Sequence, residues 1–202
     1  MEFISRRPGV PARLGILPGS FNPPTRAHLA LAEAALAEVD QVVLVLPRAF
    51  PHKSYDGASF SQRAEMLRAL ADRHPRLTAA SSDGGLFIEI ADECPAAYGA
   101  DVELAFVCGR DAAERVVGWN YDNPNTINRM LENFQLLVAR RDGAYEPSGS
   151  LCRHIRALAV AADVNSISSS DVRRRIREGI PWAHLVPDVI VPMVRRFYCA
   201  PA

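Results

Sequence analysis

The chain has 202 residues, of which 49% are hydrophobic, and its formal net charge is zero. This length suits one globular domain with a full core, and a neutral chain lacks the basic field that binds long nucleic acids, so small-molecule substrates are the expected partners. No apolar run is long enough to cross a membrane, and four cysteines without CxxC spacing or a secretory signal favour a cytoplasmic protein with free thiols.

The first strand, helix and second strand are predicted in the N-terminal part of the chain. Residues 1–12 are expected to form a flexible leader and residues 13–202 a single domain. A strand is predicted at Arg13–Leu17, a helix at Arg26–Glu38, and a valine-rich strand buried on both faces at Gln41–Leu46. This order predicts a right-handed βαβ unit with parallel strands.

Helices and strands continue to alternate along the rest of the chain. Further helices are predicted at Ser59–Arg73, from Gly109 to about Val117, and at Thr126–Glu132, Ser150–Ala161, Ser169–Glu178 and Val189–Tyr198. Further strands are predicted at Arg76–Ala80, Asp101–Cys108, Phe134–Ala139 and Asp163–Ile167. Leu86–Ile90 is either extended or the start of a short helix that ends by Tyr98.

This alternation predicts an α/β fold, a Rossmann-like doubly wound and mostly parallel sheet, with a small helical C-terminal part at about residues 168–202. Ligands of such sheets bind outside the carboxyl ends of the strands. The loops after Leu17, Leu46, Cys108 and Ala139 fall on that edge.

The turn and helix start within Leu14–Ala37 carry the first candidate site. Thr25 is a good helix N-cap, and His28 lies in the first helical turn, where unpaired N–H groups and the positive end of the helix dipole favour anions. The alternative is an ordinary capped helix with a surface histidine. Neither G-x-x-x-x-G-K-[ST] nor G-x-G-x-x-G occurs, which excludes the usual phosphate loops.

Lys53 is the second candidate. It lies in the sequence Pro51-His52-Lys53, in the loop after the second strand, and is the only lysine among many arginines. A position that stays lysine in such a chain is expected to need a compact ammonium, here to reach a phosphate near His28. The alternative is a solvated loop.

The third candidate is the helix start at Ser168, Ser169 and Ser170, with Arg173 one turn later. Hydroxyls, free N–H groups and a guanidinium form a second anion site. The alternative is a capping box of Ser168 with Asp171 and a basic helix face.

Together, GSFNPPTRAHL (19–29) and ISSSDVRRRI (167–176) resemble the nucleotidyltransferase superfamily with an (H/T)xxH motif, and within it the nicotinamide and nicotinate mononucleotide adenylyltransferases. The resemblance runs in order from about Arg13 to Tyr198. It includes PHK, Gly109-x-Asp111, VARRDG and LVPDVI…VRRFY.

The resemblance implies roles for individual residues. The N–H groups of Gly19, Ser20 and Phe21 would line the nucleotide site, and Thr25 and His28 would contact the ATP phosphates. The other implied contacts are phosphate neutralisation by Lys53, dinucleotide binding by Gly109 and Asp111, stacking of Trp119 on the pyridine, and triphosphate binding by Ser169, Ser170 and Arg173. The alternatives are a helix N-cap at Asp111 and a core position for Trp119.

The reaction implied is transfer of AMP from ATP, with Mg²⁺, to a pyridine mononucleotide in NAD biosynthesis. The segment Gly84–Ala100 lacks the threonine-containing pattern that is usual in the nicotinate-type enzymes, which leaves the acceptor open. Alternatives are a cytidylyltransferase, a phosphopantetheine adenylyltransferase, or a non-catalytic nucleotide-binding regulator. The sequence permits a homo-oligomer but does not determine it.

Overall fold

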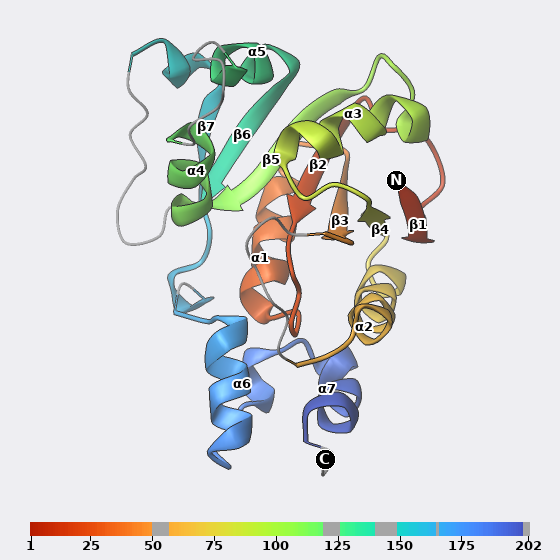
Figure 1. Ribbon diagram of the computed structural model, residues 1–202, viewed down its shortest axis with the longest axis vertical. Helices are drawn as coiled ribbons and strands as arrows, with labels where there is room; N and C mark the ends of the chain where they lie inside the picture. Colours follow the sequence, from red (N-terminus) through yellow and green to blue (C-terminus); the bar gives the residue numbers. More distant parts are fainter. Residues whose placement is uncertain (50–56, 119–125, 140–148, 165, 200–202) are drawn as a thin grey trace.

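A computed structural model describes residues 1–49, 57–118, 126–139, 149–164 and 166–199 (Figure 1). One seven-stranded sheet has the order β1-β4-β3-β2-β5-β6-β7, and its strands are parallel except for the pair β1–β4. The predicted α/β fold with a doubly wound, mostly parallel sheet is therefore confirmed.

The strands are β1 (Glu2–Ser5), β2 (Arg13–Pro18), β3 (Gln41–Pro47), β4 (Leu77–Ser82), β5 (Glu103–Gly109), β6 (Phe134–Ala139) and β7 (Ile155–Leu158). The α-helices are α1 (Arg26–Ala35), α2 (Phe60–Asp72), α3 (Phe87–Tyr98), α4 (Arg110–Val117), α5 (Thr126–Asn133), α6 (Ser169–Arg177) and α7 (Val191–Tyr198). Short 3₁₀ helices lie at Gly149–Arg153, Ala162–Val164, Ala183–Leu185 and Asp188–Ile190. None of the helices in the described ranges is both long and apolar enough to span a bilayer.

The central strands are buried on both faces, as the continuous apolar run in β3 predicts. Val42, Leu44 and Leu46 point into the core beneath α1 and α2, whereas Val43 and Val45 point into the core beneath α3, α4 and α5. This alternation is the two-residue period of a strand between two helical layers.

The N-terminal residues differ from the expected flexible leader. Glu2–Ser5 form β1, which pairs antiparallel with β4, so that Phe3 lies opposite Ala80. The ring of Phe3 also packs edge-on against Tyr98, with 5.5 Å between the ring centroids. The prediction of a loose segment is wrong for these residues, because a short strand gains its stability from pairing and packing that are remote in sequence.

Two predictions near the C-terminal part of the sheet are also wrong. The helix expected at Ser150–Ala161 is a 3₁₀ turn followed by β7, and the strand expected at Asp163–Ile167 overlaps the 3₁₀ helix Ala162–Val164. In β7 the two end residues, Ile155 and Leu158, are buried, a spacing of three that also fits a helix. Residues 155–158 form a strand because they pair with β6, and this pairing outweighs their local preference for a helix.

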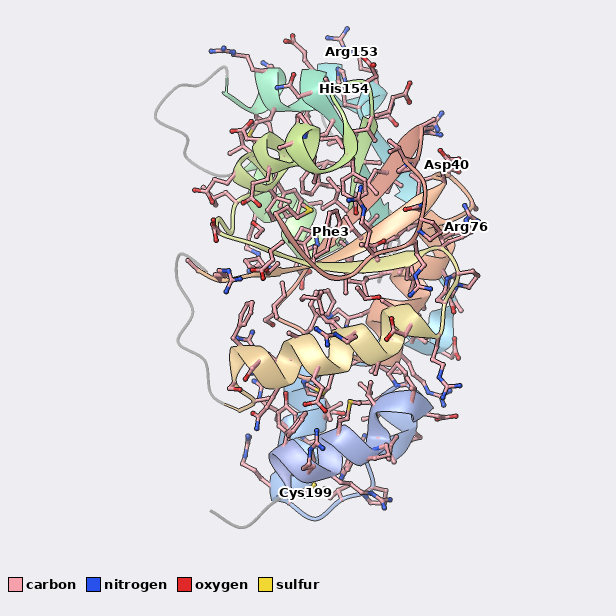
Figure 2. All side chains as sticks on the ribbon, turned by 90° about the vertical axis from the view of Figure 1, so that its right-hand side faces the viewer. Phe3, Asp40, Arg76, Arg153, His154 and Cys199 are labelled. Atoms are coloured by element: carbon pink, nitrogen blue, oxygen red, sulfur yellow. The ribbon has the colours of Figure 1, made fainter. Side chains whose placement is uncertain are left out.

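The helices α6 and α7 lie below the sheet at the bottom of Figure 1. Figure 2 shows α7, which is followed by Cys199, stacked beneath α2. Buried side chains of this C-terminal part, including Val172 and Val194, belong to the same core as Leu17 and Phe21. The C-terminal helices are thus packed against the segment that follows β2.

Candidate active site

The site lies where the strand order reverses. From β2 the chain winds outward through β3 to β4, and then crosses back to β5 on the other side of β2. Ile16 of β2 pairs with Phe106 of β5 in parallel register, so the loops after these strands leave the same edge side by side. Such a switch point is where doubly wound sheets bind ligands.

Thr25 and His28 are in direct contact at the start of α1. Thr25 is the N-cap residue, and its backbone N–H donates to Nδ1 of His28 at 3.0 Å. The Thr25 hydroxyl lies 2.7 Å from the same nitrogen. Thr25 is fully buried, so its hydroxyl orients the imidazole and does not face solvent.

This geometry determines the protonation of the imidazole. A backbone N–H can only donate, so Nδ1 must be an acceptor, and the neutral ring carries its proton on Nε2. Burial, with the Phe21 ring 5.1 Å away, lowers the pKa of His28 to about 4. At neutral pH, His28 is therefore an uncharged hydrogen-bond donor through Nε2.

The lowered pKa predicts acid sensitivity of folding. Between pH 6.5 and about 4, His28 takes up a proton in the unfolded chain but not in the folded one, so stability is lost as the pH falls through this window. We expect this proton uptake by the unfolded chain to lower the free energy of unfolding by about 1–3 kcal/mol between pH 6.5 and about 4. Urea unfolding of His28→Gln should show a shallower loss over the same pH range, whereas the exposed control His184→Gln should match the wild type. Equal slopes for all three proteins would contradict the prediction.

The loop before α1 uses its backbone differently from the expectation. The N–H of Gly19 donates to the carbonyl of Val45 at 3.0 Å, so this group is not available to a ligand. A Cβ at Gly19 would lie 3.0 Å from Cζ of Phe21, so any larger residue here would press on that ring. The Phe21 side chain is fully buried, and the carbonyl of Ser20 accepts from Arg63 at 2.9 Å.

The serine-rich start of α6 meets this same loop. Ser168 caps the helix by accepting the N–H of Asp171 at 3.1 Å, as the capping alternative predicts. The hydroxyl of Ser169 donates to the carbonyl of Pro23 at 2.7 Å, whereas Ser170 is exposed. The N-termini of α1 and α6 therefore converge, and two positive helix ends face one region.

Arg173 of α6 lies at this junction. Its Nη1 donates to the carbonyl of Asn22 at 2.6 Å, and its Nε is buried without a protein partner. The guanidinium is thus fixed beside the loop that precedes α1.

The remaining candidates come from other elements. Gly109 is the N-cap of α4, and Asp111 is exposed in its first turn, at the switch point next to β2. Lys53 and Trp119 lie outside the described residues.

Three residues of this region were missed as functional candidates. Arg63 is a buried arginine that holds Ser20, and Tyr198 donates to Oδ1 of Asn22. Asn22 is recognisable in the sequence as a turn residue. Arg63 and Tyr198 lie far along the chain from this turn, and no local pattern in the sequence identifies them as its partners.

Comparison with known proteins identifies the family. A family model described as cytidylyltransferase-like matches residues 16–175. A "Probable nicotinate-nucleotide adenylyltransferase" of Bordetella petrii is 31% identical over 196 residues, which cover 91% of this chain and 96% of that protein. The chain belongs to the nicotinate-nucleotide adenylyltransferase family. A relative of the same description from Citrifermentans bemidjiense is 30% identical, over 88% of this chain and 93% of its own.

Solved structures of this family share the fold. A Plasmodium falciparum nicotinic acid mononucleotide adenylyltransferase complexed with NaAD superposes with a TM-score of 0.70 at 14% identity, over 91% of this chain and 95% of its own. A putative nicotinate-nucleotide adenylyltransferase from Vibrio parahaemolyticus gives a TM-score of 0.60 at 16% identity, over 94% and 96% of the two chains. At these identities the likeness concerns the architecture alone.

Proposed function

We propose that the protein transfers the adenylyl group of ATP to nicotinate mononucleotide and releases pyrophosphate. The observation that carries the proposal is the Thr25–His28 pair, a pre-oriented neutral donor at a helix N-terminus beside the switch point of the sheet. The family membership and the names of its relatives supply the substrate class.

The reaction needs no protein nucleophile. A phosphate oxygen of the mononucleotide attacks the α-phosphorus of ATP in line, a new P–O bond forms, and the bond to the bridging oxygen breaks. Pyrophosphate leaves with that electron pair. The acceptor is already ionised, so a general base is not required, and the protein acts by positioning and by stabilising charge.

The residues of the site suit that task. The Nε2–H of His28 would donate to a phosphate oxygen whose charge grows in the transition state, while buried Thr25 positions the ring. The helix ends of α1 and α6 and the guanidinium of Arg173 would add positive potential. We assign Gly109 and Asp111 to the dinucleotide, and Lys53 and Trp119 to the phosphates and the pyridine as the family resemblance implies.

Magnesium would enter with the nucleotide. Among the described residues, no three His, Cys, Asp or Glu side chains are grouped to hold a metal ion. Mg²⁺ commonly keeps several waters and binds through substrate phosphates. We therefore propose MgATP as the substrate form.

The proposal is tested by offering the protein Mg²⁺ with ATP or CTP and a set of acceptors. Nicotinate mononucleotide, nicotinamide mononucleotide and phosphopantetheine would each be incubated, with pyrophosphate and the dinucleotide product measured. We expect product from ATP and nicotinate mononucleotide. Faster turnover of the amide or of CTP would change the substrate assignment, and no pyrophosphate with any pair would indicate a regulator.

The sole lysine provides a prediction of its own. Lys53→Arg keeps the charge but replaces a compact ammonium by a wide planar fork, so we expect kcat/KM for ATP to fall about tenfold. Arg68→Lys, an exchange on the exposed face of α2, is the matched control and should leave the kinetics unchanged. Unchanged kcat and KM in Lys53→Arg would show that the lysine has no role in phosphate binding.

A further inference from the structure

We infer that Tyr198 and Asn22 form a latch through which the C-terminal helix α7 positions the loop between β2 and α1 (residues 19–25), which we call the nucleotide loop. The inference rests on the proposed function, because it assigns positioning residues to the same site. We define the latch as Asn22, Tyr198 and the contacting pair Gly57 and Ala58.

Asn22 joins three segments that are remote in sequence. Its side-chain Oδ1 accepts the hydroxyl of Tyr198 at 2.5 Å and the backbone N–H of Ala58 at 3.3 Å. Its backbone carbonyl accepts from Arg173 of α6 at 2.6 Å. Asn22 is 4% exposed and lies three residues before the N-cap of α1, so a change in its position is transmitted to the start of that helix.

The hydroxyl of Tyr198 is suited to a permanent contact. Burial raises the pKa of Tyr198 well above its usual value, although Arg173 and Arg63 lower it in part. The phenol is therefore protonated at neutral pH and can donate to Asn22.

Close packing at Gly57 supports the same conclusion. A Cβ at this position would lie 2.8 Å from Oδ1 of Asn22 and 3.1 Å from Cε1 of Tyr198. A methyl group at residue 57 would thus press on both members of the hydrogen-bonded pair, so glycine at this position leaves room for the contact between Asn22 and Tyr198.

The latch belongs to a set of contacts that hold the loop carbonyls. The carbonyls of Ser20, Asn22 and Pro23 accept from Arg63, Arg173 and Ser169, respectively. A carbonyl oxygen directed at a phosphate would repel it, whereas carbonyls bonded to other parts of the protein leave the helix N-terminus to face the anion. Tyr198 contributes by fixing the side chain of the central residue in this set.

Tyr198→Phe removes the hydroxyl and keeps the ring. If Tyr198 positions the nucleotide loop, KM for ATP should rise about tenfold, while KM for nicotinate mononucleotide changes less than about twofold. Tyr98→Phe is the matched control, because Tyr98 is a buried tyrosine of α3 that packs against Phe3 of β1 and not against the loop before α1, and its KM for ATP should equal that of the wild type. Lowered thermal stability in Tyr198→Phe with unchanged ATP kinetics would overturn the inference.

A second pair of variants separates the effect of disturbing the latch from the effect of backbone strain at a glycine with positive φ. Gly57→Ala and Gly99→Ala place alanine at similar φ angles, +110° and +102°, but a Cβ at Gly99 meets nothing within 4 Å. We expect Gly57→Ala alone to weaken ATP binding, by a larger factor than Tyr198→Phe. Equal ATP affinity in the two alanine variants would contradict the latch.

Binding measurements test the latch separately from the proposed adenylyl transfer. The affinity for α,β-methylene-ATP would be measured for each variant by calorimetry. If the wild type binds the analogue but forms no dinucleotide, the proposed function fails, and the latch is judged by the analogue affinities. If the wild type does not bind the analogue, the latch inference fails as well.

Discussion

Replacing His28 by alanine is expected to lower kcat by about 100-fold or more. The substitution removes the Nε2–H donor that we place on the transition-state phosphate, and it leaves the Thr25 N–H without its 3.0 Å acceptor. Steady-state kinetics with ATP and nicotinate mononucleotide measure the first effect, and thermal unfolding measures the second. Near-normal turnover of folded His28→Ala would refute the assignment.

His28→Gln distinguishes a neutral donor from a cation. Glutamine at the third helical position can accept the Thr25 N–H as in a capping box and still present an amide N–H on its far side. We therefore expect His28→Gln to retain the stability of the wild type at neutral pH and to turn over faster than His28→Ala. If His28 acted as an imidazolium, both variants would be equally impaired. The exposed His184→Ala should be fully active.

The sequence predicts the part of the fold that depends on local pattern. Continuous apolar runs such as Gln41–Leu46 identify the buried parallel strands, and Thr25 marks the start of α1. The order of strands and helices then places the loops after β2 and β5 at one edge. These features follow from period, capping and chain connectivity, which are short-range properties.

The features that were not predicted depend on remote partners. The strand β7 forms because β6 offers it an edge, and β1 forms because β4 does so on the opposite side. In the site, the hydrogen bond between Tyr198 and Asn22 spans 176 positions. A single sequence contains no signal for such a contact, so the residues that position the loop became visible only with the structure.

Gly19 was predicted correctly as a residue of this loop, but its role in the structure differs from the role that the resemblance implies. Gly19 is a site residue in the family resemblance because of its N–H group. In the structure that N–H donates to the carbonyl of Val45, and the absence of a side chain at Gly19 leaves room for the Phe21 ring, which folds back over it. The sequence motif therefore encodes packing within the loop as well as contacts to a ligand.

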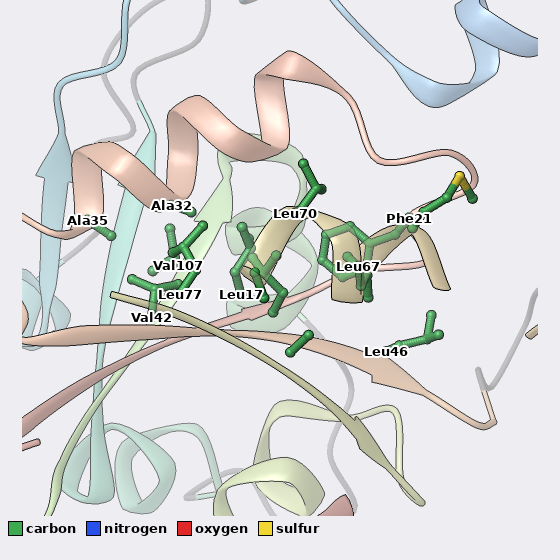
Figure 3. Close-up of a cluster of buried hydrophobic side chains, with 14 of the residues drawn as sticks. Leu17, Phe21, Ala32, Ala35, Val42, Leu46, Leu67, Leu70, Leu77 and Val107 are labelled. Atoms are coloured by element: carbon green, nitrogen blue, oxygen red, sulfur yellow. The ribbon is translucent and has the colours of Figure 1, made fainter. Parts of the chain in front are cut away.

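Of the substitutions considered for this site, Phe21→Ala is expected to lower the free energy of unfolding most. The ring is fully buried and lies in the cluster with Leu46 and Leu67 (Figure 3), and its backbone has a φ of 46°, a conformation that is uncommon outside glycine. Removal of a buried phenylalanine ring costs about 3–5 kcal/mol through lost burial and the cavity that remains. Urea unfolding would measure this loss directly.

The same substitution tests whether core packing controls the site. Phe134→Ala also empties a buried phenylalanine position, but at the start of β6 in the core on the other face of the sheet, so it is a control of similar cost. At a temperature where both variants are folded, we expect Phe21→Ala to lose more than about tenfold in kcat/KM and Phe134→Ala to remain close to wild type. The difference would arise because the Phe21 ring packs against Gly19 and lies beside His28, so the cavity opens within the nucleotide loop. Equal losses in both variants would mean that activity follows global stability, and the buried ring would then have no separate role in placing His28.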